Sequence, residues 1–397
     1  MRIGHLFVAG CGLALLVAAL PGTSARGAEA IDLAKAQKLT ADREAMKAQV
    51  QAGGTEDLAW SWFITLNTPL TGSGPKQWEG WRQTSTIYLP NGARPAPWGQ
   101  TPAPPEAVIK LAQQLRLDLN LPFHNLDSDV QSDGLALRDK LKHPGPGTLK
   151  HNENVRYQIL MNADAFNYVL DNGIYNINGQ QAMAQANKPT DFPWSAVELK
   201  TSWIWIGTDP GIYNQLNGKY YIVNAYYALV DGSGKPNGLY QVGRAALTGM
   251  HIISKPVPQW LWMTFQNVYD DQFTHSTNKL LPLAQSVKAA NQLYRGKLQQ
   301  MGSIFANYQL IGTQWQFVDG SGKPILLANS QIETAFQQAS SCVTCHAIAS
   351  YSPSQGYFSI VKQQDDGITY YTGNPPPTTG YNPLDFIWSL KRAQWQR

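Results

Sequence analysis

Cysteine is scarce in this chain of 397 residues, which has three: Cys11, Cys342 and Cys345. Because Cys11 lies in a segment that we expect to be removed, the mature chain has a single pair. It therefore has no second pair with which to complete a cysteine-rich zinc site. A thioredoxin-like redox dithiol is also disfavoured, since no βαβ pattern surrounds the pair.

Charge and long apolar runs are sparse as well. Charged residues make up 15% of the chain and the formal net charge is +4 at pH 7, which is too mild to indicate nucleic-acid binding. Beyond the N-terminus no segment approaches the roughly 20 apolar residues of a membrane-spanning helix, so we expect no transmembrane helix after signal removal. The chain also lacks a glycine-rich nucleotide loop and a nucleophile elbow.

The first 30 residues have the three parts of a secretory signal peptide. Met1 and Arg2 form a short positive region, residues 6–20 are apolar, and residues 28–30 (Ala-Glu-Ala) match a small-x-small cleavage site. We therefore expect export to the bacterial periplasm. Lipid anchoring at Cys11, which follows a Val-Ala-Gly sequence, is the alternative; it is disfavoured because most of the apolar run follows that cysteine.

Residues 342–346 read Cys-Val-Thr-Cys-His, the signature for attachment of haem c. Two thiols three residues apart face the same side of a helical turn, where they can form thioethers with the two haem vinyl groups. The adjacent imidazole of His346 is then held against the iron as its proximal ligand. The sequence thus predicts one covalent haem c bound through Cys342, Cys345 and His346, in agreement with the export signal.

The sequence upstream of this motif predicts an α+β fold, with a large aromatic-rich antiparallel β domain at residues 31–329 and helices at its periphery. The 13 Trp and 18 Tyr residues indicate extensive aromatic packing. Stretches with β-strand character occur at residues 197–207 and 219–230, and residues 239–254 and 260–268 can continue the sheet as a meander. Residues 311–318 return to strand after a predicted helix. Helices are predicted at residues 31–52, 161–170, 180–187 and 281–301.

Residues 330–397 are expected to form a helical segment that carries haem c and is integrated with the preceding domain. Ser330 and Glu333 fit a capping box at the start of a haem helix. Leu384, Ile387, Trp388 and Trp395 recur at helical spacing. They predict an amphipathic C-terminal helix that packs near the haem.

The second axial ligand of the iron is not evident from the motif. A common electron-carrying cytochrome c has a Met ligand some tens of residues after the motif, but residues 347–397 contain neither Met nor His. The ligand must come from upstream or from Lys362 or a tyrosine such as Tyr351 or Tyr357; otherwise the iron is five-coordinate or holds water.

Among the upstream candidates, His251 is the favoured residue for the distal pocket, as axial ligand or hydrogen-bonding group. It lies in an apolar stretch with β-strand character, and Met250 and Met263 are lesser candidates for the iron. The alternative for His251 is a core histidine bonded to a backbone carbonyl. The remaining upstream histidines are expected to be mostly structural or surface residues: His124, His143, His151 and His275.

Several segments resemble a group of exported bacterial proteins of the cytochrome c family with a C-terminal Cys-x-x-Cys-His motif. The matching segments span most of the mature chain: residues 60–67, 199–203, 249–252, 260–265, 311–315 and 341–346. This resemblance implies one integrated mono-haem protein rather than a detachable cytochrome domain. The family is expected to have Phe-Glu-His where this chain has Phe265-Gln266-Asn267, which puts any role of that acid and histidine in doubt here.

Three functions follow from these features. The first is a periplasmic mono-haem c-type cytochrome that passes single electrons between partners, which are redox proteins or small-molecule electron donors or acceptors. The second is a haem-dependent oxidoreductase, peroxidase- or oxygenase-like, because the large aromatic domain exceeds what electron carriage requires. The third is a haem-based sensor of a small ligand. The position of the motif is also similar to that in cytochrome c prime and in β-rich hydroxylamine-oxidising cytochromes, which leave iron open to small ligands.

Overall fold

The computed structural model describes residues 30–72, 74–126, 142–143, 153–154, 156–231, 236–273, 282–333, 337–364 and 367–397. Residues Ile31–Arg397 form one compact unit. The predicted signal peptide with Cys11, and the side chains of His143, His151 and His275, lie outside the described residues.

Helices and strands alternate irregularly along the chain, as expected for an α+β protein. The α-helices are α1 (Leu33–Thr40), α2 (Arg43–Gln51), α3 (Thr55–Leu66), α4 (Glu106–Gln114), α5 (Ala163–Asp171), α6 (Ile177–Gln185), α7 (Pro210–Leu216), α8 (Asp270–Phe273), α9 (Gln285–Gln300) and α10 (Cys342–Ala347). The strands of the main sheet are β1 (Arg82–Gln83), β2 (Phe123–Asn125), β5 (Arg156–Met161), β6 (Val197–Gly207), β7 (Ile222–Val230), β8 (Pro236–Ser254), β9 (Leu261–Asn267) and β10 (Tyr308–Gln314).

Smaller elements complete the described part of the chain. The short strands are β3 (Lys142–His143), β4 (Glu153–Asn154), β11 (Ser350–Ser352), β12 (Gly356–Tyr357), β13 (Val361–Gln364), β14 (Gly367–Tyr370) and β15 (Asn382–Pro383). The 3₁₀ turns are η1 (Gln77–Gly80), η2 (Thr84–Thr86), η3 (Pro90–Gly92), η4 (Ile304–Asn307), η5 (Gln337–Ala339) and η6 (Trp388–Arg392).

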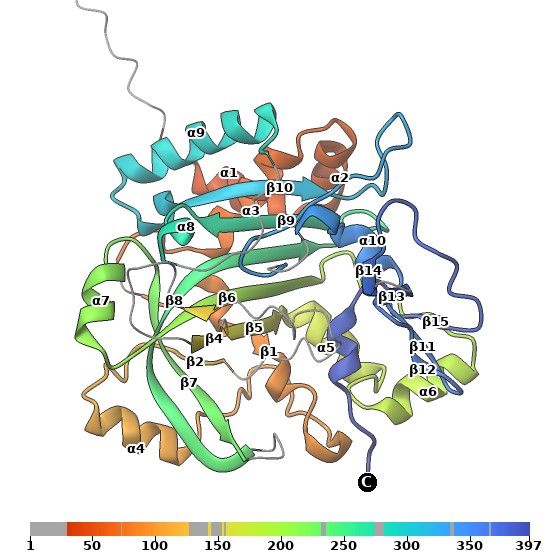
Figure 1. Cartoon of the computed structure of the whole chain (residues 1–397), viewed down its shortest axis with the longest axis horizontal. Helices are drawn as coiled ribbons and strands as arrows, with labels where there is room; N and C mark the ends of the chain where they lie inside the picture. Colours follow the sequence, from red (N-terminus) through yellow and green to blue (C-terminus); the bar gives the residue numbers. More distant parts are fainter. Residues whose placement is uncertain are drawn as a thin grey trace, which may run out of the picture. The chain divides into compact units, whose positions relative to one another are not determined.

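The main sheet is built around the long strand β8 (Figure 1). Strand β6 pairs with β8 on one side, while on the other side β7 pairs with its first part and β9 with its last part. Strand β10 continues the sheet from β9, and β5 and β1 continue it from β6. All these pairs are antiparallel, whereas β2 runs parallel to β7. The predicted α+β class with an aromatic-rich antiparallel sheet is therefore confirmed.

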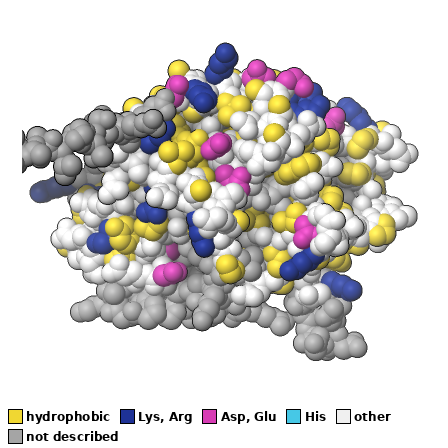
Figure 2. All heavy atoms as spheres, turned by 90° about the horizontal axis from the view of Figure 1, so that it is seen from above, with side chains coloured by type: hydrophobic (Ala, Val, Ile, Leu, Met, Phe, Trp, Pro, Cys, Tyr) yellow, Lys and Arg dark blue, Asp and Glu magenta, His cyan; other side chains and the backbone are white. Residues whose placement is uncertain are grey.

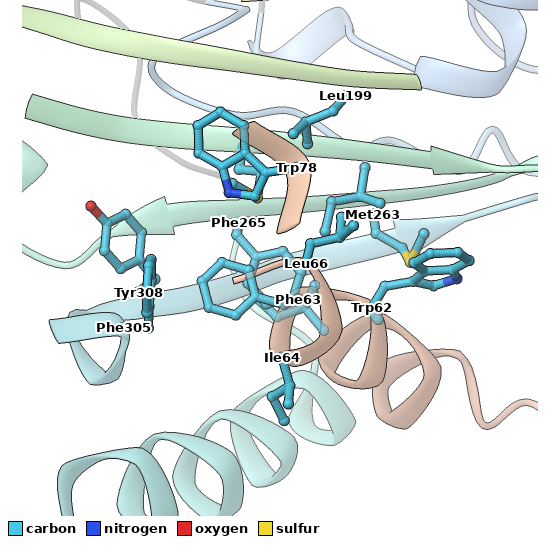
Figure 3. Packing of buried hydrophobic residues seen from close by; sticks show 14 of the residues in the cluster. Trp62, Phe63, Ile64, Leu66, Trp78, Leu199, Met263, Phe265, Phe305 and Tyr308 are labelled. Atoms are coloured by element: carbon cyan, nitrogen blue, oxygen red, sulfur yellow. The ribbon is translucent and has the colours of Figure 1, made fainter. Parts of the chain in front are cut away.

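The two faces of the sheet contact different hydrophobic clusters, because side chains alternate along each strand. One face, with Leu199, Met250 and Phe265, belongs to a core that includes Trp60 and Phe63 of α3. Figure 3 shows this packing, with Met263 directed toward Trp62. The other face, with Ile253 and Trp262, belongs to a second cluster that also contains Cys342 and Val343 of the motif. The sheet thus separates the α3 core from the motif.

Two predicted features of the C-terminal segment are wrong. No helix starts at Ser330: residues 330–332 form a turn, the Ser330 hydroxyl donates to Oε1 of Gln266, and α10 begins only at Cys342. Residues 384–395 do not form an α-helix either. Positive φ angles at Asp385 and Phe386 interrupt helical geometry, and only the 3₁₀ turn η6 follows.

Within the described residues, no helix has the length and apolar character needed to cross a lipid bilayer.

Candidate functional site

The Cys-x-x-Cys-His motif occupies a single short helix, α10. Cys342 is buried, with its Sγ 3.6 Å from the Leu327 carbonyl, whereas Cys345 and His346 are partly exposed. Neither cysteine is in a disulfide bond. Burial, followed by the nearby Glu333 charge, raises the pKa of the Cys342 thiol well above its ordinary value. Because Cys342, Cys345 and His346 all lie in α10, both thiols and the imidazole project from about one turn of helix, as the sequence predicts.

The imidazole of His346 is held in a defined orientation. Its Nδ1 lies 2.7 Å from the Phe386 carbonyl oxygen, and because a carbonyl can only accept, Nδ1 carries the proton. The Trp262 ring lies 4.2 Å from the imidazole, centroid to centroid. Although His346 is partly exposed, desolvation of its ring by the surrounding side chains lowers the pKa of His346 to about 4, so the ring is neutral at pH 7. Nε2 therefore keeps the lone pair that a metal ion requires.

Residues 384–392, which follow β15, form hydrogen bonds with the motif. The Trp388 indole nitrogen donates to the Cys345 carbonyl at 2.8 Å. Asp385 and Phe386 have φ angles of 50° and 68°, a region in which residues other than glycine are uncommon. Their conformation directs the Phe386 carbonyl at His346. The segment thus contacts the motif, although its conformation is not helical; its packing near the haem stays a prediction.

Strands β6, β8 and β9 carry a row of polar side chains, side by side, on one face of the sheet. This is the face that packs against the motif cluster, the second hydrophobic cluster, which contains Cys342 and Val343. Lys200 of β6 lies directly opposite His251 of β8, and His251 lies directly opposite Thr264 of β9. Opposed residues of antiparallel strands project to the same face. Trp262, two residues before Thr264, also lies on this face and contacts His346.

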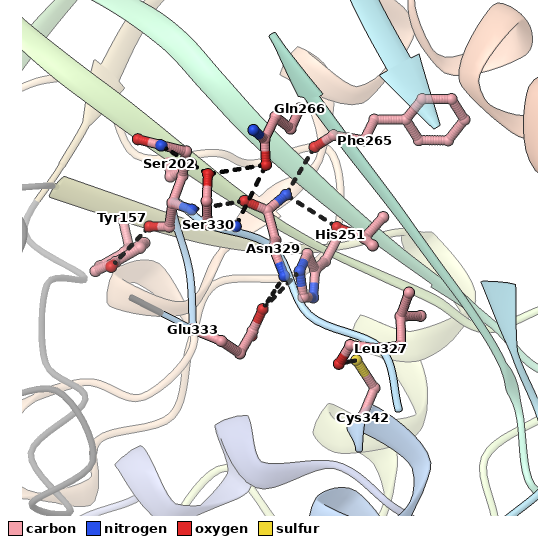
Figure 4. Close-up of polar contacts among 12 residues, drawn as sticks. Tyr157, Ser202, His251, Phe265, Gln266, Leu327, Asn329, Ser330, Glu333 and Cys342 are labelled. Atoms are coloured by element: carbon pink, nitrogen blue, oxygen red, sulfur yellow. Dashed lines mark hydrogen bonds and ion pairs between the residues drawn. The ribbon is translucent and has the colours of Figure 1, made fainter. Parts of the chain in front are cut away.

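The side chain of Glu333 points toward His251 (Figure 4). The distance from His251 Nε2 to Glu333 Oε2 is 3.5 Å, at the outer limit for a hydrogen bond, and this nitrogen has no better partner among the described residues. Both side chains are almost completely buried, with exposed fractions of 9% and 12%. His251 thus contacts a carboxylate, and no hydrogen bond from its ring to a backbone carbonyl is found among the described residues; its place in a distal pocket stays a prediction.

Charges in this row affect one another. Burial lowers the pKa of Lys200 to about 8, although Glu333 opposes the shift. Burial alone would raise the pKa of Glu333, but His251, Lys200 and a hydrogen bond from the Asn329 amide outweigh it and lower that pKa. At pH 7 the row therefore combines a partly exposed cation with an almost completely buried anion.

A strap formed by residues 327–333 crosses the sheet beside this row (Figure 4). Asn329 anchors it by donating through Nδ2 to Thr264 Oγ1 and to the Phe265 carbonyl, both at 2.9 Å. The strap passes so close to β8 that a Cβ at Gly249 would lie 3.0 Å from Asn329 Nδ2. Glycine at position 249 therefore lets the strap bring Glu333 over the sheet.

The remaining candidates lie elsewhere. Met250 and Met263 are buried on the opposite face of the sheet, in the α3 core, so the structure does not bring them together with the motif. His124 is also buried there, between Glu79 and Gln158. Lys362 is exposed on β13.

Gln266 and Asn267 occupy the positions where the resembling family is expected to have Glu and His. Gln266 Oε1 accepts from Ser330, and Asn267 Nδ2 donates to the Lys219 carbonyl at 2.9 Å. Neutral side chains with structural hydrogen bonds thus replace the expected acid and histidine.

Sequence reasoning missed Lys200, Glu333 and Phe386 as neighbours of the motif. Lys200 is a charged residue within an otherwise largely apolar strand, β6, and this unusual position could have indicated a role near a site. The sequence around Glu333 indicates only a helix cap, and Phe386 acts through its backbone oxygen, which sequence does not reveal.

Known proteins give no further guidance. No family model, curated protein or solved structure matches this chain. The family resemblance of the short segments remains a prediction, and the assignment of function rests on the chemistry of the site.

The donor set fits haem c. Two thiols outside disulfide bonds and a neutral imidazole with its Nε2 lone pair available lie on one helical turn. In the described parts of the chain, no group of three or more His, Cys, Asp or Glu side chains could hold a bare metal ion.

Proposed function

We propose that the protein is a periplasmic mono-haem c-type cytochrome that transfers single electrons, with its haem carried by the C-terminal segment. Cys342 and Cys345 would hold the haem by thioether bonds and His346 would ligate the iron. The observation that carries the proposal is the bond from His346 Nδ1 to the Phe386 carbonyl, at 2.7 Å. A histidine ligand typically donates its other ring N–H to such an acceptor.

The surrounding residues would control the environment of this group. When bound, haem supplies a one-electron iron couple. Trp262 covers the imidazole and Phe386 fixes its proton at Nδ1. Burial of Cys342 and the motif cluster limits contact with water, which is one of the means by which proteins set a reduction potential.

The partner is proposed to be a redox protein or a small electron donor or acceptor. On the face shown in Figure 2, cationic and anionic side chains are interspersed among hydrophobic ones. Together with the net charge of +4, this mixed surface gives little long-range steering by charge on that face. We therefore expect the reaction rate with a partner to depend only weakly on salt concentration.

The proposal is tested by producing the exported chain in cells that attach haem c. One haem per chain should remain bound after denaturation and acidic solvent extraction, as judged by absorption and intact mass. Cys342→Ala and Cys345→Ala together should abolish this covalent haem. The exposed Ser354, a few residues after the motif, offers a control: Ser354→Ala should retain it. Wild-type protein without covalent haem would refute the proposal.

A second candidate is a haem enzyme or sensor that binds a small ligand. It is favoured by the row of Lys200, His251 and the almost completely buried Glu333, because electron carriage does not require such a cluster of ionisable side chains beside the motif. The same purified sample separates the two candidates. A low-spin ferrous spectrum that carbon monoxide leaves unchanged supports electron transfer, whereas a high-spin spectrum with rapid carbon monoxide binding supports the enzyme or sensor.

A further inference from the structure

The acceptor of His346 belongs to a strained corner of the backbone. Asp385 and Phe386 both have left-handed φ angles, 50° and 68°. Aspartate tolerates this conformation, but for a bulky residue such as phenylalanine it is an outlier. Such a conformation persists only when the surrounding structure holds it in place. The contacts of the corner therefore matter for the position of the Phe386 carbonyl.

Asp385 is the anchored residue of the corner. Its Oδ2 accepts from Lys255 Nζ at 2.6 Å and from the Phe192 amide at 2.7 Å, while its Oδ1 accepts from the Trp260 indole at 3.2 Å. The carboxylate is thus bonded to three residues from two segments of the chain, Phe192 and the connection between β8 and β9 that contains Lys255 and Trp260. Its side chain is 9% exposed, so these are desolvated, charge-assisted hydrogen bonds.

Lys255 is equally enclosed, with its side chain 9% exposed. Besides Asp385, its Nζ donates to the Phe192 carbonyl at 2.7 Å and to Asp191 at 2.5 Å. The two carboxylate partners differ sharply, since Asp191 is 84% exposed and Asp385 only 9%. The buried bond to Asp385 is the one that bears on the corner.

One stretch of chain, from the β8–β9 connection into β9, contacts both the His346 ring and the residue that holds its Nδ1 acceptor in place. Lys255 and Trp260 lie in this connection and hold Asp385, while Trp262, two residues further on, packs against the His346 ring. The ring face and the Nδ1 acceptor are therefore both held by one continuous stretch of chain, the β8–β9 connection and the start of β9. No other hydrogen bond to the His346 ring is present among the described residues.

We propose that Lys255 and Asp385 are positioning residues for His346. They hold the Phe386 carbonyl where it selects the tautomer with the proton at Nδ1, so that Nε2 faces the iron in a single orientation. This inference rests on the proposed haem function and specifies how its axial ligand is set. A stronger bond at Nδ1 makes the imidazole a better electron donor, which lowers the reduction potential of the iron.

The experiment compares two matched carboxylate variants of the full-length chain. Asp385→Asn keeps the size of the side chain and its tolerance of left-handed φ, but it removes the charge that binds Lys255. Asp191→Asn removes the exposed partner of the same lysine and serves as the control. Lys255→Met removes the cation itself, and Lys255→Arg tests rescue by a conserved charge.

Two measurements are made on each protein. Nitrogen-15 NMR of the histidines in the haem-free chain reports the tautomer of His346, assigned with His346→Ala. Redox titration of the haem-loaded chain reports the potential. Asp385→Asn and Lys255→Met should give a mixture of tautomers and a higher potential, with a roughly tenfold change in the redox equilibrium, which is about 59 mV for one electron. Asp191→Asn and Lys255→Arg should resemble the wild type.

The proposal is overturned if wild-type His346 lacks a single Nδ1-protonated tautomer, a measurement that needs no variant to fold. It is also overturned if Asp385→Asn leaves both readouts unchanged, or if Asp191→Asn changes them equally. Wild-type protein that never acquires covalent haem refutes the proposed function instead. In that case the tautomer of the haem-free chain still decides the positioning role.

Discussion

Glu79 is a carboxylate that lies almost fully buried beside the α3 core, where an unpaired charge would be strongly destabilising. Its Oε1 is 2.9 Å from His124 Nε2 and accepts from the Tyr221 hydroxyl at 2.9 Å, while Oε2 accepts from the Lys76 amide. Burial alone would raise the pKa of Glu79, but these bonds outweigh it and lower that pKa below its ordinary value.

A pH-dependent stability follows from this lowered pKa. Because the folded state holds the proton less tightly than the unfolded state, Glu79 contributes stability above its unfolded pKa, and that contribution is lost as the pH falls through its folded pKa. Glu79→Gln should cost about 3–5 kcal/mol near pH 7, as for other broken buried pairs. The difference from wild type should shrink on acidification, which urea unfolding at pH 7 and pH 4 measures.

Glu106 is the control for this substitution. It forms an ion pair with Lys110 on α4, and both side chains are largely exposed, Glu106 at 81% and Lys110 at 68%. Exposed pairs of this kind contribute little to stability. Glu106→Gln should therefore unfold almost as wild type does at both pH values. An equal loss in the two variants, or a Glu79→Gln penalty that does not change with pH, would contradict the assignment.

How far sequence predicts a single residue depends on whether its role is local. Cys342, Cys345 and His346 could be identified because their spacing within one helical turn is itself the signal. The acceptor of His346 lies 40 residues further along the chain, and no local pattern relates the two. Lys255 was visible only as a charge after a strand, since its carboxylate partners come from residues 191 and 385.

Whole elements show the same distinction. The strands β6 to β10 were predicted within a few residues because alternation and β-branched or aromatic content are local properties. The periodic spacing of Leu384, Ile387 and Trp388 predicted a helix, but in an irregular segment the same residues reach the core by backbone turns at Asp385 and Phe386. The periodic spacing thus correctly indicated which side chains pack in the core, but it did not predict the backbone conformation that places them there.

At the level of elements, the strap over β8 gives a prediction with an internal contrast. Gly249→Val should push Asn329 away, because even a Cβ would lie 2.9 Å from Ser202 Oγ and 3.0 Å from Asn329 Nδ2. Overpacking typically costs 1–3 kcal/mol. The variant should unfold at lower urea concentration, and limited proteolysis should cut the strap faster than in the wild type.

Gly296 is the contrasting position. It lies within α9, and a Cβ there would meet nothing within 4 Å. Gly296→Ala should therefore stabilise the protein by about 0.5–1 kcal/mol, because alanine loses less conformational freedom in a helix than glycine does. Loss of stability at position 296, or none at position 249, would show that the packing described for these glycines is wrong.

Considered as a whole, the molecule has a sheet with a hydrophobic core on each face. The core on the motif side draws residues from widely separated parts of the chain, including Ile87, Met161, Trp262, Val343 and Leu390. A segment whose buried residues depend on such distant partners cannot bury them alone. The integration of residues 330–397 with the rest of the chain is therefore a property of the packing, which sequence alone could only suggest.

This shared core predicts that the chain unfolds as one unit. For the full-length protein, the near-ultraviolet circular dichroism of the aromatic residues and the absorption of the bound haem should report the same urea midpoint, because the α3 core and the motif-side core are built on the two faces of one sheet. A separately produced fragment of residues 330–397 should show no cooperative transition, since Val343 and Leu390 lose Trp262 and Met161. Two separate midpoints in the full chain, or a fragment that melts cooperatively, would instead mean that the motif segment is an autonomous domain. The expected result is a single transition, because removing either half of this core exposes apolar surface that only the other half covers.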